Sequence, residues 1–129
     1  MGPGARFALW GGIVAAATGV ALVGGAVRMQ APGLGWGVLG WGAAVAPGLT
    51  FGTWLARRHG TPGTGFVAAL GAGILVRFVT VLGSLAWVLA EGAGAQRIWL
   101  AGVLAGYVPL QLFEVAWFVR RSRRLAAAR

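Results

Sequence analysis

The sequence is poor in acidic residues and lacks cysteine altogether. Among its 129 residues only Glu91 and Glu114 are acidic, and His59 is the single histidine. The absence of cysteine excludes disulfides and thiolate metal ligands. Two glutamates and one histidine also leave too few groups for a Ser-His-Asp or Cys-His set, or for a metal site with three or four ligands. We therefore expect a protein that is not an enzyme and that holds no metal.

Apolar residues, by contrast, make up 58% of the chain and are gathered into long runs. Four runs each approach the roughly 20 residues that a helix needs to cross about 30 Å of hydrocarbon. They span residues 7–27, 35–56, 66–90 and 98–119. Because the joints between them are too short for a second domain, the pattern predicts one all-α domain over residues 1–129. This domain is an integral membrane bundle of four transmembrane helices, followed by a basic tail at 120–129.

The basic residues are arginines that lie, with one exception, near the ends of these runs. Four spans place both termini and the central joint on the same side of the membrane. That side carries Arg6, Arg57, Arg58, Arg120, Arg121, Arg123, Arg124 and Arg129. The other side carries only Arg28 and Arg97, so the positive-inside rule predicts that both termini are cytoplasmic. This distribution accounts for the net charge of +9 without nucleic acid, and the expected surroundings are membrane lipids.

Several glycines are spaced for close helix packing. Gly48 and Gly52, and likewise Gly102 and Gly106, form GxxxG patterns, which let helix backbones approach each other within this chain, in a second copy or in a partner. Residues 35–40, GWGVLG, match the dinucleotide fingerprint GxGxxG only formally, because that motif works between a strand and a helix. We expect no cofactor there, and we expect these glycines to bring the second helix close to a neighbour.

Aromatic residues and the histidine are placed as in a membrane interface. Six tryptophans lie near the ends of the runs, where an indole keeps its N–H in water and its ring among acyl chains. They are Trp10, Trp36, Trp54, Trp87, Trp99 and Trp117. Trp41 lies further inside and is expected to pack against another helix. His59 follows Arg57 and Arg58, and we expect it to be solvated or to face lipid headgroups.

Two neighbouring runs each carry a polar stripe. In the third run Arg77, Thr80 and Ser84 share a helix face by their spacing of three and four. In the fourth run the same spacing places one stripe on a single face, and its members are Tyr107, Gln111 and Glu114. A charge at the bilayer centre costs about 3 kcal/mol on insertion scales, so Arg77 needs an anionic partner or water.

Three environments for Arg77 are open at this point. Helix geometry puts Arg77 roughly 18 Å from the cytoplasmic end of its run and Glu114 roughly 7 Å from the same end. An internal pair must then span an offset of about 10 Å, which favours Gln111 or Tyr107 as intermediate acceptors. Alternatively, Arg77 meets a carboxylate of another membrane protein, or lines a water-filled path.

A family resemblance adds to this interpretation over residues 35–119. A basic amino-terminal helix is followed by GWGVLGWGAAVAPGLTFGTWLARR, with Pro47 in mid-helix, and then by a run in which Gly73 stands four residues before Arg77. This arrangement resembles the ATP synthase protein I family, small four-helix membrane proteins of bacteria. The family's third helix carries Gly-Glu-x-x-Lys, so the basic position is kept as Arg77 while Ile74 replaces the acidic one.

The resemblance implies a multi-pass protein of the bacterial inner membrane that assists assembly or stabilisation of the ATP synthase c-ring. Arg77 would then meet the membrane-embedded carboxylate of a c subunit, with Thr80 and Ser84 as hydrogen-bond donors beside it. An alternative is a small cation transporter or channel component lined by Arg77 and the polar stripe of the fourth run. A further alternative is an integral accessory subunit of another respiratory or photosynthetic complex.

Overall fold

The described residues form four long α-helices. A computed structural model describes residues 1–59, 63 and 65–129, and its helices are α1 (Pro3–Arg28), α2 (Leu34–Arg58), α3 (Gly65–Leu89) and α4 (Ala93–Ala127). All four are long and apolar enough to cross a membrane, which indicates a multi-pass membrane protein. The described part of the chain contains no strand. The prediction of an all-α chain with four candidate spans is therefore confirmed.

Helix boundaries follow local backbone chemistry. Pro3 stands in the first turn of α1, where its missing N–H costs no hydrogen bond. The α1–α2 turn needs a left-handed backbone at Gln30 and Gly33, and Gly92 serves the turn between α3 and α4 with a φ of 95°. Two prolines, Pro47 in α2 and Pro109 in α4, lie inside helices without ending them.

The predicted and observed helix ends differ most for the fourth helix. The fourth helix does not end at residue 119 as predicted, because α4 runs without a break through most of the basic segment to Ala127. Arginine and alanine are both strong helix formers, and no glycine or proline interrupts this stretch. The final turns of α4 therefore hold their arginines at fixed angles around a helix axis, which matters for the surface described below.

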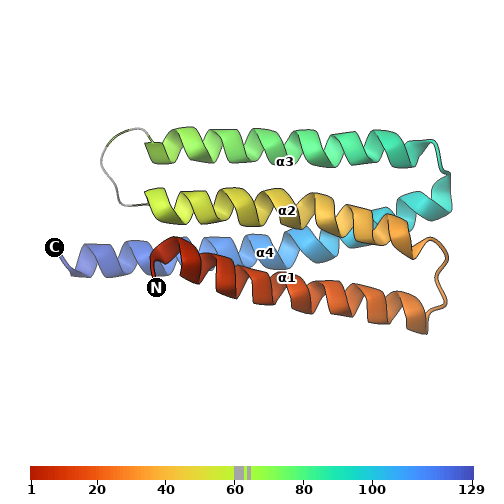
Figure 1. The fold of residues 1–129 in the computed structure, drawn as a ribbon, viewed down its shortest axis with the longest axis horizontal. Helices are drawn as coiled ribbons and strands as arrows, with labels where there is room; N and C mark the ends of the chain where they lie inside the picture. The colour runs from red at the N-terminus through yellow and green to blue at the C-terminus, as the bar shows by residue number, and fades with distance from the viewer. Residues whose placement is uncertain (60–62, 64) are drawn as a thin grey trace.

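In the bundle α2 lies at the centre. It contacts each of the other helices, while α1 also packs on α4 and α3 touches α4 only slightly. Figure 1 shows α3 along one side of α2, with α1 and α4 on the other side. Both termini lie at the end of the molecule where α2 finishes and α3 begins. The helices alternate in direction, so α3 and α4 are antiparallel, as are α1 and α4.

Glycines bring α2 and α4 into backbone contact. A Cβ on Gly102 would collide with the carbonyl oxygen of Gly37, and one on Gly40 would collide with the carbonyl oxygen of Trp99. A Cβ on Gly106 would lie 3.0 Å from the carbonyl oxygen of Trp41. These contacts answer the question left open by the GxxxG pattern of α4: its glycines pack within this chain.

The second GxxxG pair also lies at contacts within the chain. A Cβ on Gly48 would lie 2.8 Å from a methyl carbon of Leu110 on α4, and one on Gly52 would collide with the ring of Phe7 on α1. Trp41 packs against α1, where its indole N–H donates to the Thr18 hydroxyl over 3.2 Å. The expectation that Trp41 contacts another helix is therefore confirmed.

Candidate functional site

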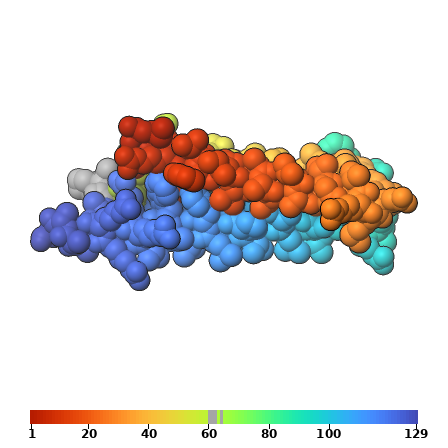
Figure 2. Space-filling model, turned by 90° about the horizontal axis from the view of Figure 1, so that it is seen from below, coloured from red at the N-terminus to blue at the C-terminus, as the bar shows by residue number. Residues whose placement is uncertain are grey.

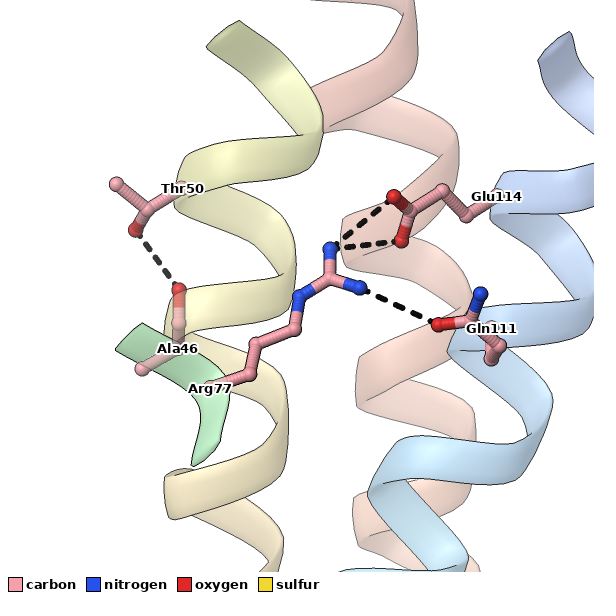
Figure 3. A network of polar contacts seen from close by, with 5 residues as sticks. All are labelled: Ala46, Thr50, Arg77, Gln111 and Glu114. Carbon is pink, nitrogen blue, oxygen red and sulfur yellow. Dashed lines mark hydrogen bonds and ion pairs between the residues drawn. The ribbon is translucent and has the colours of Figure 1, made fainter. Parts of the chain in front are cut away.

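Arg77 and Glu114 form a direct ion pair between α3 and α4. One terminal nitrogen of Arg77, Nη2, donates to both carboxylate oxygens of Glu114, at 2.8 and 3.1 Å, and Nη1 donates to the amide oxygen of Gln111 at 3.2 Å. Figure 3 shows the guanidinium extended toward α4 between these two acceptors. The side chains are only 14% and 8% exposed. Of the three environments open for Arg77, the structure has the internal pair.

The pair forms in spite of the offset expected between the two residues. The rings of Phe66 and Phe118 lie 6.0 Å apart at one end of α3. The hydrogen bond of 3.0 Å between Trp99 and Ser84 gives nearly the same register of α3 against α4, so Phe66 and Phe118 lie at about the same level. Counted from that level, Arg77 lies eleven residues along α3 and Glu114 four residues along α4, a difference of about 10 Å. The backbone offset is therefore the one predicted, yet no intermediate acceptor is needed.

Side-chain direction removes the offset. A helical Cβ points toward the amino terminus of its own helix. Because α3 and α4 are antiparallel, Arg77 leans toward the level of Glu114 while Glu114 leans toward the level of Arg77. The estimate from residue spacing omits both tilts and so underestimates how far the pair can reach.

Small residues of α2 make room for the pair. Arg77 and Glu114 border a cleft of about 10 Å³ that is also lined by Ala44 and Gly48 of α2 and by Tyr107 of α4. A volume of this size is about the minimum that holds one water molecule. Tyr107 thus joins the cleft as part of the predicted stripe, but within the described chain its hydroxyl makes no hydrogen bond to the pair.

The two hydroxyls predicted to assist Arg77 are bonded elsewhere. The Thr80 hydroxyl donates to the carbonyl oxygen of Val76 on its own helix, at 2.7 Å. The Ser84 hydroxyl donates to the Val81 carbonyl and accepts a hydrogen bond of 3.0 Å from the indole of Trp99. Ser84 and Trp99 therefore form a second, buried link between α3 and α4. The prediction that the Trp99 indole keeps its N–H in water is wrong, because Trp99 is only 5% exposed and its N–H donates to Ser84.

Gly73 and Ile74, two positions of the family pattern, lie on different sides of α3. Gly73 is buried against α2, where a Cβ would lie 3.1 Å from the Cβ of Phe51. Ile74, at the position that is acidic in the family pattern, is 52% exposed. A large side chain at position 73 would push α3 away from α2, and with it the backbone that carries Arg77.

His59 ends α2 and lies partly buried. Its ring contacts Phe66 and Phe118 and shares a 3.2 Å hydrogen bond with the hydroxyl of Ser122. Burial, and secondly the positive charge of Arg121, lower the pKa of His59 below its ordinary value. The histidine expected in solvent or at headgroups thus closes the end of the bundle against aromatic rings.

The described residues contain no group of three or more histidine, cysteine or acidic side chains that could hold a metal ion.

A surface that was not predicted from the sequence lies between the start of α1 and the end of α4, where arginines and tryptophans of both helices line a groove. The spacing of Trp117, Arg120 and Arg124 at three and four residues is the signal in the sequence that indicates this surface. No family model, curated protein or solved structure matches the chain.

Proposed function

We propose that this protein is a non-enzymatic assembly or accessory factor of a membrane complex, in which Arg77 meets a carboxylate carried by a transmembrane helix of a partner. The observation that carries the proposal is a guanidinium held within a candidate span of α3 with donor capacity left over. A guanidinium has five N–H donors. Three hydrogen bonds to Glu114 and Gln111 use the two terminal nitrogens, and Nε is buried without a partner in the described structure, which leaves one N–H of Nη1 for a further acceptor.

In this proposal Glu114 is the resting counterion of Arg77. A lone charge in the bilayer is costly, so a protein that awaits a partner needs an internal acceptor until the partner arrives. Glu114 and Gln111 provide it without covering every donor. A carboxylate from a neighbouring helix would then share the guanidinium, or replace Glu114, at the same depth.

The surface of α3 supports docking on this side of the bundle. Helix α3 packs mainly on α2 and leaves most of its circumference uncovered. Its uncovered side chains are large and apolar, and include Leu75, Phe78, Val79 and Leu82. An apolar surface without charges fits the flank of another transmembrane helix, where association depends on packing.

The resemblance to the ATP synthase protein I family points to the c subunits of a bacterial rotary ATP synthase as the partner, and to the inner membrane as the location. The excess of arginine at the end that holds both termini supports a cytoplasmic position for that end. An accessory role in another respiratory or photosynthetic complex would differ only in the identity of the partner helix.

Cation transport, the alternative from another class, receives less support. The cleft beside Arg77 and Glu114 has room for about one water molecule. The only carboxylate within it is already engaged by Arg77, whereas divalent cations prefer several oxygen ligands. The small cleft and the engaged carboxylate therefore favour a structural ion pair between Arg77 and Glu114 over an ion-conducting path.

The proposal is tested by co-purification with c subunits in mild detergent. Replacement of Arg77 alone would leave Glu114 unpaired, so the informative variant is Arg77→Gln/Glu114→Gln, which removes both charges and keeps polar side chains. The matched control is Glu114→Gln, which removes the carboxylate but leaves Arg77 with an amide acceptor at position 114 beside that of Gln111. We expect the double variant to lose the c subunits and the control to retain them. Equal recovery with wild type and the double variant would remove the recognition role of Arg77.

A further inference from the structure

A groove of about 1160 Å³ lies between the start of α1 and the end of α4. In Figure 2 the red end of α1 lies alongside the blue end of α4. Four arginines line this groove, namely Arg6, Arg120, Arg121 and Arg124. It lies between α1 and α4 toward the end where both termini are found, whereas the Arg77–Glu114 pair lies between α3 and α4, and no part of the proposed function uses the groove.

The lining changes in order along the helix axes. On α1, Arg6, Trp10 and Ile13 follow at intervals of four and three residues and so share one face over about 10 Å. On α4, Arg124, Arg120, Trp117 and Phe113 repeat the same order on one face. Because the helices are antiparallel, both series run the same way, from guanidinium through indole to apolar side chain. A phospholipid has this same order of phosphate, glycerol ester and acyl chain.

The groove arginines have no acidic counterion within the protein. The chain has two acidic side chains; Glu114 is held by Arg77, and Glu91 lies in the turn between α3 and α4 at the opposite end. Two polar atoms of lining residues, Nε of Arg121 and the indole nitrogen of Trp117, are buried and have no hydrogen-bond partner within the described structure. The anion that balances this charge is therefore not an acidic side chain of this protein.

We propose that this groove binds one anionic phospholipid. The arginines hold its phosphate, Trp10 and Trp117 lie beside the glycerol region, and an acyl chain runs along Ile13 and Phe113. Basic pockets between membrane helices bind anionic headgroups in this way. A zwitterionic lipid fits less well, because its headgroup amine finds four guanidinium groups and no carboxylate in the groove.

The test is native mass spectrometry of the detergent-purified protein titrated with phosphatidylglycerol or with phosphatidylcholine of the same acyl chains. We expect one phosphatidylglycerol to bind at least tenfold more tightly than phosphatidylcholine. Each arginine near anionic lipid contributes roughly fivefold, so Arg120→Gln/Arg124→Gln should weaken binding about 25-fold. The matched control, Arg123→Gln/Arg129→Gln, removes the same charge from the same end outside the groove lining and should change affinity less than threefold.

A steric variant tests the acyl part of the groove without a change of charge. Ile13 is 50% exposed, so Ile13→Trp is compatible with folding, and it should fill the space beside Phe113 and lower phosphatidylglycerol occupancy at least fivefold. Equal affinity for the two lipids would overturn the proposal. So would equal losses in the two arginine variants, or wild-type occupancy in Ile13→Trp.

Discussion

At the scale of single residues, the central feature is a charge pair that residue spacing alone placed too far apart. The stripe on α4 was predictable from intervals of four and three, and the need of Arg77 for an anion followed from its depth. What spacing could not supply was the lean of each side chain toward its own helix amino terminus, which brings Arg77 and Glu114 together. The hydrogen bonds of Thr80 and Ser84 could not be predicted from spacing either, because the hydroxyl of a residue in a helix readily donates to the backbone carbonyl three or four residues earlier.

The first prediction concerns the strength of this pair. Arg77→Leu leaves Glu114 buried without a partner and should lower the free energy of unfolding by about 3–5 kcal/mol. Arg77→Leu/Glu114→Leu removes both charges and should unfold within about 1 kcal/mol of wild type, or be more stable. Equilibrium unfolding of the three proteins in mixed detergent micelles measures the difference. Similar losses in the single and the double variant would mean that the pair is not coupled.

The second prediction concerns the protonation of His59. Because its pKa in the folded protein lies below its ordinary value of 6.5, the unfolded chain binds the proton more tightly than the folded chain. The contribution of His59 to stability is therefore complete above about pH 6.5 and decreases as the pH falls toward the folded pKa. As His59 is the only histidine, its ring resonances in a micelle-bound NMR sample report this pKa directly.

The control for His59 is Arg121→Gln. Loss of the nearby positive charge should raise the pKa of the ring part of the way toward 6.5, while burial keeps it below that value. A measured pKa at or above 6.5 in the wild-type protein would show that the ring is not buried against Phe66 and Phe118 as described.

At the scale of helices, the four spans were readable from the sequence, but their arrangement was not. Run length and apolar content identified each span because a bilayer sets a fixed length. The central place of α2 could not be predicted, since all four helices are apolar around most of their surface and the sequence does not say which side faces protein. The glycine patterns of α2 and α4 indicated close contacts, whereas their partners, such as Gly37 against Gly102, required the structure.

The contact between α2 and α4 makes a specific prediction for Gly102. The Gly102→Ala variant introduces a Cβ against the carbonyl oxygen of Gly37, so the helices must separate, with a cost of about 1–3 kcal/mol. Gly83→Ala on α3 is the control, because its Cβ would meet open space and alanine is the better helix former. Unfolding in mixed micelles should show Gly102→Ala destabilised and Gly83→Ala unchanged or slightly stabilised. Equal stability of the two variants would contradict the close α2–α4 contact.

At the scale of the whole molecule, the protein has two sides, which are proposed to bind different partners: a lipid in the groove between α1 and α4, and a transmembrane helix on α3. The bundle of α1, α2 and α4 is held by glycine contacts and carries the basic groove at one end. Helix α3 is attached along one side and presents apolar residues and the edge of the charge pair. The spacing of arginine and tryptophan marks one wall of the groove on α4, but the whole groove could not be predicted from sequence, because it joins residues from the two ends of the chain.

The most direct test of the central claim is site-specific photo-crosslinking in native membranes of a strain that contains the rotary ATP synthase. A photoreactive residue at Phe78 on α3, next to Arg77 and 64% exposed, is compared with one at Val20 on α1, which is 73% exposed. If α3 docks against a partner at the depth of Arg77, position 78 should crosslink to subunit c at least fivefold more than position 20, and the excess should vanish in the Arg77→Gln/Glu114→Gln background. Equal crosslinking from the two positions, or an excess at position 78 that survives loss of both charges, would contradict the account.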